Sequence, residues 1–176
     1  MFRQFRRYPG EGFLFGDMSV PSPRRYLMGV QRDGLRACIC HGDLHSGNIF
    51  VQGEQYGFID FESTGIGHIY EDFTALEASL RLELPGISTE AEMLEGIEAE
   101  KKLWSEGQAT GSIEKIITEI RECAKNVFEW NEHEYLISLA YRCFGLFRIP
   151  RIPDDKLRRI GCTLAFCLWR AEQTTD

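Results

Sequence analysis

Hydrophobic residues follow two different periods along the chain, and the period changes near residue 65. Before that point they come in short bursts separated by glycine, proline or charged residues, which is typical of strands and turns. From Tyr70 onward they recur every three to four residues, for example at Phe73, Leu76 and Leu80. The pattern predicts an α+β protein in which a small β-hairpin is followed by a mostly α-helical bundle.

The β-rich part is predicted to contain one short strand and one hairpin. The apolar segment 35–40 indicates a buried strand. Two further apolar bursts, residues 48–51 and 56–61, flank Gln52-Gly53-Glu54-Gln55, a tight connection that favours a hairpin. The glycine-rich segment 65–67 predicts a loop.

Capping and breaking residues divide the remainder into helices. Pro85-Gly86 ends the first helix, and the next runs from about Ser88 to Glu106. Ser112 is expected to cap the third, and Asp154 or Asp155 to cap the last. The sequence predicts four helices at about residues 70–84, 88–106, 112–127 and 132–147. A fifth and last helix begins near residue 154.

Composition narrows the class of protein. The chain is 43% hydrophobic and 27% charged, no apolar run approaches the roughly 20 residues that span a bilayer, and no secretory signal precedes the first elements. We therefore expect a cytoplasmic protein with no membrane partner and reduced cysteines.

Charge is distributed unevenly. Residues 1–37 carry seven arginines against three acids, whereas the rest of the chain carries a net charge of −11. Without a long basic stripe, no nucleic-acid partner is expected. The segment 1–36, rich in Arg, Gly and Pro, is predicted to be irregular with at most one short helix or strand, and residues 37–176 are predicted to form the main domain.

The residues with side chains suited to catalysis or metal binding lie in two segments, His41-Gly42-Asp43-Leu44-His45-Ser46-Gly47-Asn48-Ile49-Phe50-Val51 and Ile59-Asp60-Phe61-Glu62. Asp43 follows a predicted strand in a loop with a flanking glycine. Asn48 begins the first hairpin strand and Asp60 follows the second, so the hairpin should bring these two side chains together. An amide oxygen beside a carboxylate suits Mg²⁺, with water and phosphate completing the coordination.

These segments resemble known enzymes. HGDLHSGNIFV is similar to the catalytic loop of aminoglycoside phosphotransferases and choline kinases, and IDFE is similar to their metal-binding element. The segment 65–73 resembles the loop that leads into the following helix of the same family. The resemblance covers about 32 residues well and implies the C-terminal catalytic lobe of a kinase-like phosphotransferase.

The resemblance also assigns roles to single residues. It implies that Asp43 is the catalytic residue and that Asn48 and Asp60 bind Mg²⁺ and the phosphates of ATP or GTP. It further implies that Asp72 holds the loop through its backbone N–H groups. His41 would pack beneath the loop, and His45 would contact either the loop or a phosphate.

The implied activity is transfer of the γ-phosphate to a hydroxyl of a small molecule or, alternatively, of a protein. Only 40 residues precede His41, which is too few for a nucleotide-binding N-terminal lobe, and no lysine occurs before Lys101. We therefore expect a protein partner or an upstream lobe to complete the site. The alternative is a non-catalytic, kinase-derived binding or signalling module.

Two weaker interpretations concern other residues. Cys38, Cys40, His41 and His45 are chemically able to bind zinc, but alternation along a strand directs His41 away from the two cysteines. Three acids of the first predicted helix indicate either a solvated face or a contact for a cationic acceptor: Glu71, Glu77 and Glu83.

Overall fold

The computed structural model describes residues 12–30, 35–105, 107 and 109–174. Its strands are β1 (Phe13–Phe15), β2 (Met18–Val20), β3 (Ala37–Cys40), β4 (Ile49–Gln52), β5 (Gln55–Phe58) and β6 (Gly65–His68). Its helices are α2 (Pro23–Gly29), α3 (Glu71–Arg81), α4 (Glu90–Ser105), α5 (Ser112–Val127), α6 (Glu132–Leu146) and α7 (Asp154–Gln173). Two short 3₁₀ turns are η1 (Ser46–Asn48) and η2 (Phe61–Ser63). Helices combined with small antiparallel sheets make this an α+β arrangement.

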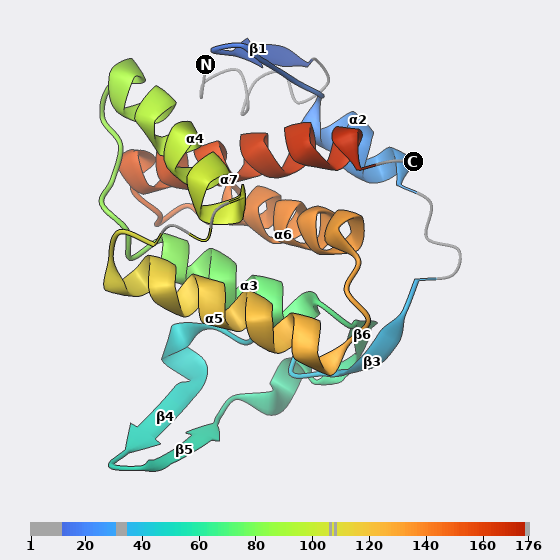
Figure 1. Cartoon of the computed structure of the whole chain (residues 1–176). Coiled ribbons are helices and arrows are strands. Elements are labelled where there is room, and N and C mark those ends of the chain that lie inside the picture. The colour runs from blue at the N-terminus through green and yellow to red at the C-terminus, as the bar shows by residue number, and fades with distance from the viewer. Residues whose placement is uncertain (1–11, 31–34, 106, 108, 175–176) are drawn as a thin grey trace.

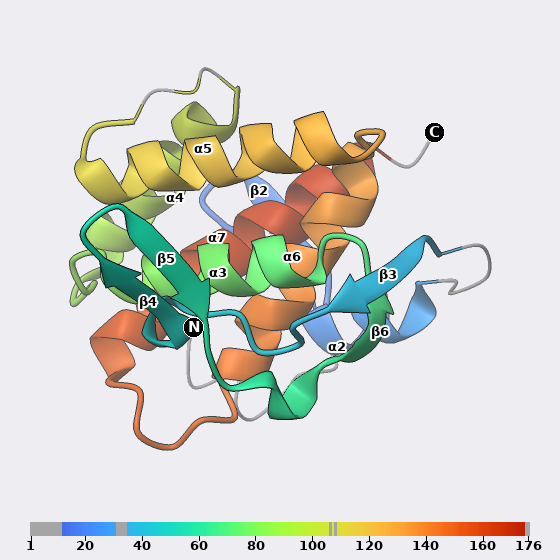
Figure 2. The ribbon, with the colours of Figure 1, turned by 90° about the horizontal axis from the view of Figure 1, so that it is seen from below.

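The described strands form three separate antiparallel pairs, β1–β2, β3–β6 and β4–β5. The predicted hairpin is confirmed as β4–β5, in which Val51 pairs with Tyr56 and Gly53 adopts a positive φ of 61° in the turn. This hairpin projects from the helices (Figure 1), and in the view from below it lies in front of them (Figure 2).

The loop predicted at 65–67 is wrong. These residues belong to strand β6, whose Ile66 lies opposite Ile39 of β3. The glycines indicate a loop when only neighbouring residues are considered. Here the backbone hydrogen bonds are satisfied by a strand 27 residues earlier in the chain, which overrides the local preference.

The N-terminal segment is more ordered than expected. Its described part holds β1, β2 and α2, and the side chains of Phe15, Met18 and Leu27 are buried in the main hydrophobic core. Pro23 begins helix α2 instead of breaking structure, because proline is compatible with a first helical position and Ser22 Oγ accepts the Arg25 N–H at 3.3 Å. Residues 1–11 lie outside the described part of the chain.

The core lies between the helices. Helix α7 packs against α6 and α4, while α3 packs against α6 and α5 (Figure 1). Every residue of α7 from Ile160 to Leu168 is buried, so this helix is surrounded by protein along its central turns. None of the helices in the described part combines the length and apolar content needed to cross a membrane.

Two predicted helix caps are displaced by one residue. Gly111, not Ser112, is the N-cap of α5, and Pro153 precedes α7, so that Asp154 and Asp155 lie in its first turn. The carboxylates there still favour the helix, because they face the positive end of its dipole.

The expected solvated acidic face of α3 is wrong for Glu77. This side chain is fully buried and accepts hydrogen bonds from Arg121 Nε at 3.0 Å and Nη2 at 2.6 Å, from Arg81 Nη2 at 2.8 Å and from the Tyr135 hydroxyl at 2.7 Å. Burial alone raises the pKa of Glu77, but the two guanidinium groups outweigh it and lower the pKa to about 2. Glu83 alone among these three acids is exposed.

The ionic cluster extends beyond α3. Arg81 also pairs with Glu100 of α4, which accepts a hydrogen bond from Thr163 Oγ1 of α7 at 2.9 Å. With Arg121 on α5 and Tyr135 on α6, the cluster joins five helices through buried polar groups. A charge can be buried at this depth only when it is paired, so these contacts fix how the helices pack.

Candidate active site

The loop after strand β3 is held by the carboxylate of Asp72, in the first turn of α3. Its Oδ2 accepts the backbone N–H of His41 at 2.7 Å, and its Oδ1 accepts that of Gly42 at 3.0 Å. Both oxygens are thereby used, and two consecutive peptide groups are fixed relative to the helix. Hydrogen bonds to a charged acceptor are stronger than those between neutral groups.

Gly42 occupies a position that accepts no side chain. Its φ is +85°, and a Cβ there would lie 2.2 Å from the carbonyl oxygen of Ser63, in the turn after the hairpin. The loop and the segment after Asp60 therefore approach each other backbone to backbone. This close approach explains why glycine precedes Asp43.

Asp43 follows directly and is presented to solvent. Its side chain is 57% exposed, and its Oδ2 lies 3.9 Å from His45 Nε2. No other described group contacts this carboxylate, while its backbone carbonyl accepts the Asn48 amide at 2.9 Å. The chain thus fixes the backbone of Asp43 and leaves its carboxylate available.

Asn48 connects the loop with the hairpin. Its Nδ2 donates to Asp43, and its backbone carbonyl accepts the N–H of Ile59 at 3.0 Å, which extends the β4–β5 ladder by one step. Asp60 is the next residue, so the register places its backbone one residue beyond the partner of Asn48. The Oδ1 of Asn48 accepts no hydrogen bond within the described residues, although the side chain is only 6% exposed.

Asp60 has a backbone conformation that L-residues rarely adopt. Its φ of 65° and ψ of 64° are left-handed, and it is the single non-glycine residue with positive φ in the described part of the chain. The carboxylate is exposed and forms no hydrogen bond with any described group. Backbone strain at an unpaired carboxylate is typical of a functional position.

The two histidines of the motif differ in their surroundings. His41 is buried, its Nε2 lies 2.8 Å from the Ile59 carbonyl oxygen, and its ring packs 4.9 Å from that of Phe61. His45 is half-exposed, and its Nδ1 accepts the Gly47 N–H at 3.1 Å. His41 therefore lies beneath the loop, while His45 caps the η1 turn and faces Asp43.

Two supporting residues, Arg142 and Ser79, were not identified from the sequence. Arg142 of α6 donates from Nη2 to the Gly42 carbonyl at 3.2 Å and to Glu71 Oε1 at 2.6 Å, and the Ser46 N–H bonds to Ser79 Oγ at 3.3 Å. Arg142 lies 100 residues from Gly42. The one signal of Arg142 in the sequence is an arginine within an otherwise apolar helix. Its salt bridge with Glu71 makes the Glu71 carboxylate less available to a cationic acceptor.

The donor groups fit Mg²⁺ better than zinc. In the described part of the chain, no three His, Cys, Asp or Glu side chains are arranged to hold a metal ion. Cys38 and Cys40 lie on one side of β3, with their sulfurs 3.6 Å apart, whereas His41 is directed to Ile59. Burial and the neighbouring thiol raise the pKa of Cys40 to about 12, which disfavours the thiolate that zinc requires. Asn48 and Asp60 instead offer unpaired oxygens, the donors that Mg²⁺ prefers.

Comparison with known proteins supports the resemblance seen in the sequence. Residues 22–106, slightly less than half of the chain, match the family model described as "Phosphotransferase enzyme family" (APH). No curated protein and no solved structure matches the chain. The matched range includes the loop, the hairpin and Asp72, but not Arg142. Over residues 22–106 the chain is therefore similar to the phosphotransferase enzyme family.

Proposed function

We propose that the chain provides the catalytic lobe of a kinase that transfers the γ-phosphate of ATP or GTP to a hydroxyl group of a small molecule. The observation that carries this proposal is the double hydrogen bond from His41 and Gly42 to Asp72, after which Asp43 extends an exposed carboxylate. Phosphoryl transfer depends mainly on positioning, so a rigid backbone beneath a free carboxylate is the feature it requires.

In this proposal Asp43 accepts the proton of the acceptor hydroxyl as its oxygen bonds to phosphorus and the bond to the leaving nucleoside diphosphate breaks. Asn48 and Asp60 hold Mg²⁺, which neutralises charge on the phosphates when it is bound. Asn48 suits this role because its amide nitrogen is bonded to the Asp43 carbonyl, which leaves its oxygen unused. The proposed kinase-like lobe comprises residues 37–176, and its nucleotide requirement makes the cytoplasm the expected location.

Exposed apolar side chains support the further proposal that a second lobe or a partner protein covers this site. Val51 and Tyr56, paired on one face of the hairpin, are 66% and 79% exposed, and Phe50 on the opposite face is 53% exposed. Ile39 and Ile66, opposite each other in β3–β6, are 80% and 87% exposed. A two-stranded hairpin gains little stability alone, and each of these strand pairs presents two neighbouring apolar side chains that a covering lobe or partner would bury.

The absence of a lysine before Lys101 favours a second candidate, a kinase-derived module that binds nucleotide or protein without transferring phosphate. Lysine ordinarily anchors the phosphates in such enzymes. A module that binds nucleotide makes the same prediction for nucleotide binding as the kinase and differs from it in turnover, whereas a module that binds only protein predicts neither.

The first experiment is a thermal melt of the purified chain with ATP or GTP, with and without Mg²⁺. A ligand that binds only the native state at a hundredfold its Kd stabilises by about 2.7 kcal/mol, which shifts Tm by several degrees. We expect a Mg²⁺-dependent rise that disappears in Asp60→Ala. The matched control is Glu54→Ala, an exposed acid in the hairpin turn, which should keep the full shift. No shift at about millimolar nucleotide would rule out a nucleotide site in this chain alone.

A second variant separates catalysis from binding. Asp43→Asn should keep the Mg²⁺-dependent shift, because Asp43 is not a proposed metal ligand. It should abolish phosphate transfer, measured as nucleoside diphosphate release with a panel of hydroxyl compounds. If wild type binds nucleotide but releases diphosphate no faster than Asp43→Asn, the non-catalytic module is the correct function.

A further inference from the structure

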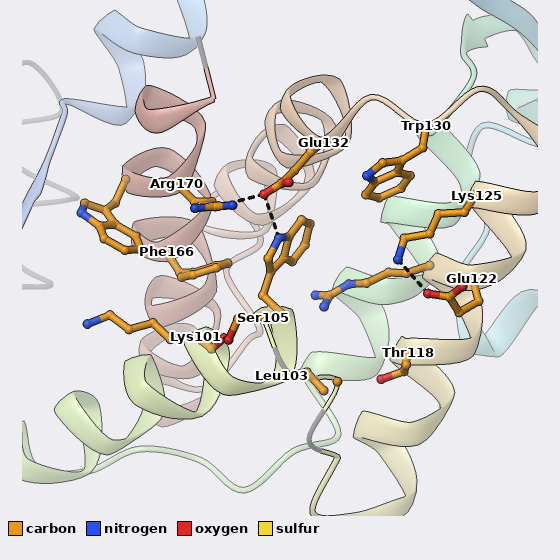
Figure 3. A pocket seen from close by; sticks show the side chains of 14 residues that line it. Lys101, Leu103, Ser105, Thr118, Glu122, Lys125, Trp130, Glu132, Phe166 and Arg170 are labelled. Carbon is orange, nitrogen blue, oxygen red and sulfur yellow. Dashed lines mark hydrogen bonds and ion pairs between the residues drawn. The ribbon is translucent and has the colours of Figure 1, made fainter. Parts of the chain in front are cut away.

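A cavity of about 630 Å³ opens between the end of α4, helix α5, the start of α6 and the end of α7 (Figure 3). Its volume lies within the range of small-molecule sites. The chain contains three tryptophans, and all three line this cavity: Trp104, Trp130 and Trp169. Tryptophan is an uncommon residue, so gathering every copy at one cavity calls for a specific explanation.

The aromatic rings form one connected series beside the cavity. Trp169 lies 6.0 Å from Phe166, and Phe166 lies 5.8 Å from Trp104, between ring centroids. Tyr135 then connects Trp104 at 6.1 Å with Trp130 at 5.0 Å. These spacings are those of packed aromatic pairs. Neighbouring rings are tilted by 40° to 53°, and the tryptophans among them line the cavity with apolar faces against which another ring can pack.

Two guanidinium groups flank the indole of Trp104. The Arg121 guanidinium carbon lies 4.2 Å from its ring centroid, while Arg170 Nε and Trp104 Nε1 both donate to Glu132 Oε1, at 2.8 and 3.0 Å. Figure 3 shows the contact between Arg170 and Glu132. Both guanidinium groups therefore lie next to the same ring.

Each of these arginines retains unused donors. Arg121 is 7% exposed and uses Nε and Nη2 for Glu77, while Arg170 uses only Nε. Among the described residues, Arg121 Nη1 and both Nη nitrogens of Arg170 have no hydrogen-bond partner. The spare Nη1 of the buried Arg121 can donate to an anion, and the two free Nη nitrogens of Arg170 form the fork that suits a carboxylate.

We propose that this cavity binds a small aromatic carboxylate. The ring stacks against the tryptophan series, and the carboxylate accepts hydrogen bonds from Arg121 Nη1 and Arg170. The existing bonds of Arg121 to Glu77 are kept, because the ligand uses a nitrogen that Glu77 does not. The cavity is already present without a ligand, so binding requires no rearrangement of the core.

This cavity is separate from the proposed transfer site. Both contact helix α6, but Glu132 of the cavity lies in its first turn, whereas Arg142, which bonds to Gly42, lies in its last part. Ten helical residues correspond to about 15 Å along the axis. The ligand is therefore not the phosphate acceptor at Asp43, and the proposal does not depend on the chain being a kinase.

The test uses 3-phenylpropanoate as the probe and intrinsic tryptophan fluorescence as the readout. Excitation at the red edge of the tryptophan band avoids absorption by the probe, and every tryptophan reports from the cavity. We expect a saturable change in emission with the acid. The neutral analogue 3-phenylpropanamide, which keeps the ring and loses the charge, should bind at least about tenfold more weakly. Inorganic phosphate, which has the charge and lacks the ring, should bind at least about tenfold more weakly than the acid.

Two variants locate the binding site. Arg170→Gln should weaken binding of the acid about tenfold, and Trp130→Leu should weaken it several-fold. Lys115→Gln, an exposed α5 cation outside the cavity, should bind as wild type does. Cooperative melting of each variant confirms that it is folded, and Trp130→Leu tests the site if Arg170→Gln does not fold.

Several results would overturn the proposal. These are a fluorescence change that does not saturate, equal affinity for the acid and the amide, equal affinity for the acid and inorganic phosphate, or unchanged affinity in both cavity variants.

Discussion

Two carboxylates on helix α3, five residues apart, hold different parts of the molecule. Asp72 is half-buried and accepts two backbone N–H groups from the loop before Asp43. Glu77 is fully buried and accepts only side-chain donors, from Arg81, Arg121 and Tyr135. The first carboxylate fixes a surface loop, and the second fixes the packing of the helices around it.

The difference lies in what removal of each carboxylate leaves behind. Without Asp72, water can accept hydrogen bonds from the two freed N–H groups of the loop, so the loss in the free energy of unfolding is modest. Without Glu77 the buried Arg121 loses its carboxylate partner, and the fully buried Arg81 keeps only Glu100. Loss of Asp72 should therefore have a local effect, whereas loss of Glu77 should affect the whole fold.

The largest effect is expected for Glu77→Ala. Removing one partner from a buried ion pair costs about 3–5 kcal/mol, because the remaining charge is uncompensated. The free energy of unfolding in urea should fall by this amount. Glu83→Ala, the exposed acid on the turn after α3, is the matched control and should change it by less than about 0.5 kcal/mol. A loss below about 1 kcal/mol for Glu77→Ala would show that the cluster does not fix the core.

Gly42→Ala should rank second and act on the loop. Its Cβ would meet the Ser63 carbonyl, and its backbone would be strained at φ +85°. We expect a loss of about 2–4 kcal/mol, from about 1–2 for the left-handed backbone and the rest for the contact. Gly53→Ala separates the two causes, because Gly53 has a φ of +61° and nothing within 4 Å of the added Cβ. Equal losses in the two variants, measured by urea unfolding, would argue against the close approach.

The same contrast explains what the sequence could predict. The hairpin, the helices and the motif residues from His41 to Asp72 have local signatures, because turns, helical periods and the order of the motif are read from neighbouring residues. The contacts of Glu77 with Arg121 and of Arg142 with Gly42 have no local signature, because these partners lie 44 and 100 residues apart in the chain. Strand β6 was missed for the same reason, since its glycines gain a partner only when β3 is present.

Asp72→Asn should have a smaller and local effect. The amide offers one acceptor oxygen where the carboxylate has two, so one of the two bonds to the loop is lost, at about 1–2 kcal/mol. Hydrogen exchange should lose protection at the amides of His41 and Gly42 and remain unchanged in α6 and α7.

The control for Asp72→Asn is Asp154→Asn, an exposed acid in the first turn of α7. It removes the same charge from a helix start without any loop contact, so it measures the dipole contribution alone, about 0.3–1 kcal/mol. Exchange that also accelerates throughout the α6–α7 core in Asp72→Asn would mean that the loop and the core are not separable.

The smallest effect concerns His68, which lies between the two regions. Its Nε2 is 3.3 Å from Glu134 Oε2, a carboxylate that also pairs with Arg36. Burial lowers the pKa of His68 below its ordinary value of 6.5, although Glu134 opposes this shift. The unfolded chain therefore takes up the proton first as pH falls. The contribution of neutral His68 to the free energy of unfolding is complete above about pH 6.5 and is lost as pH falls toward the lower folded pKa.

Between about pH 7.5 and pH 5, wild type should therefore lose more stability than His68→Asn. The difference should be less than about 1 kcal/mol, measured by urea unfolding. The reverse order would mean that Glu134 raises the pKa of His68 by more than burial lowers it. The contact between the loop and the core would then depend on an ion pair, as the cluster around Glu77 does.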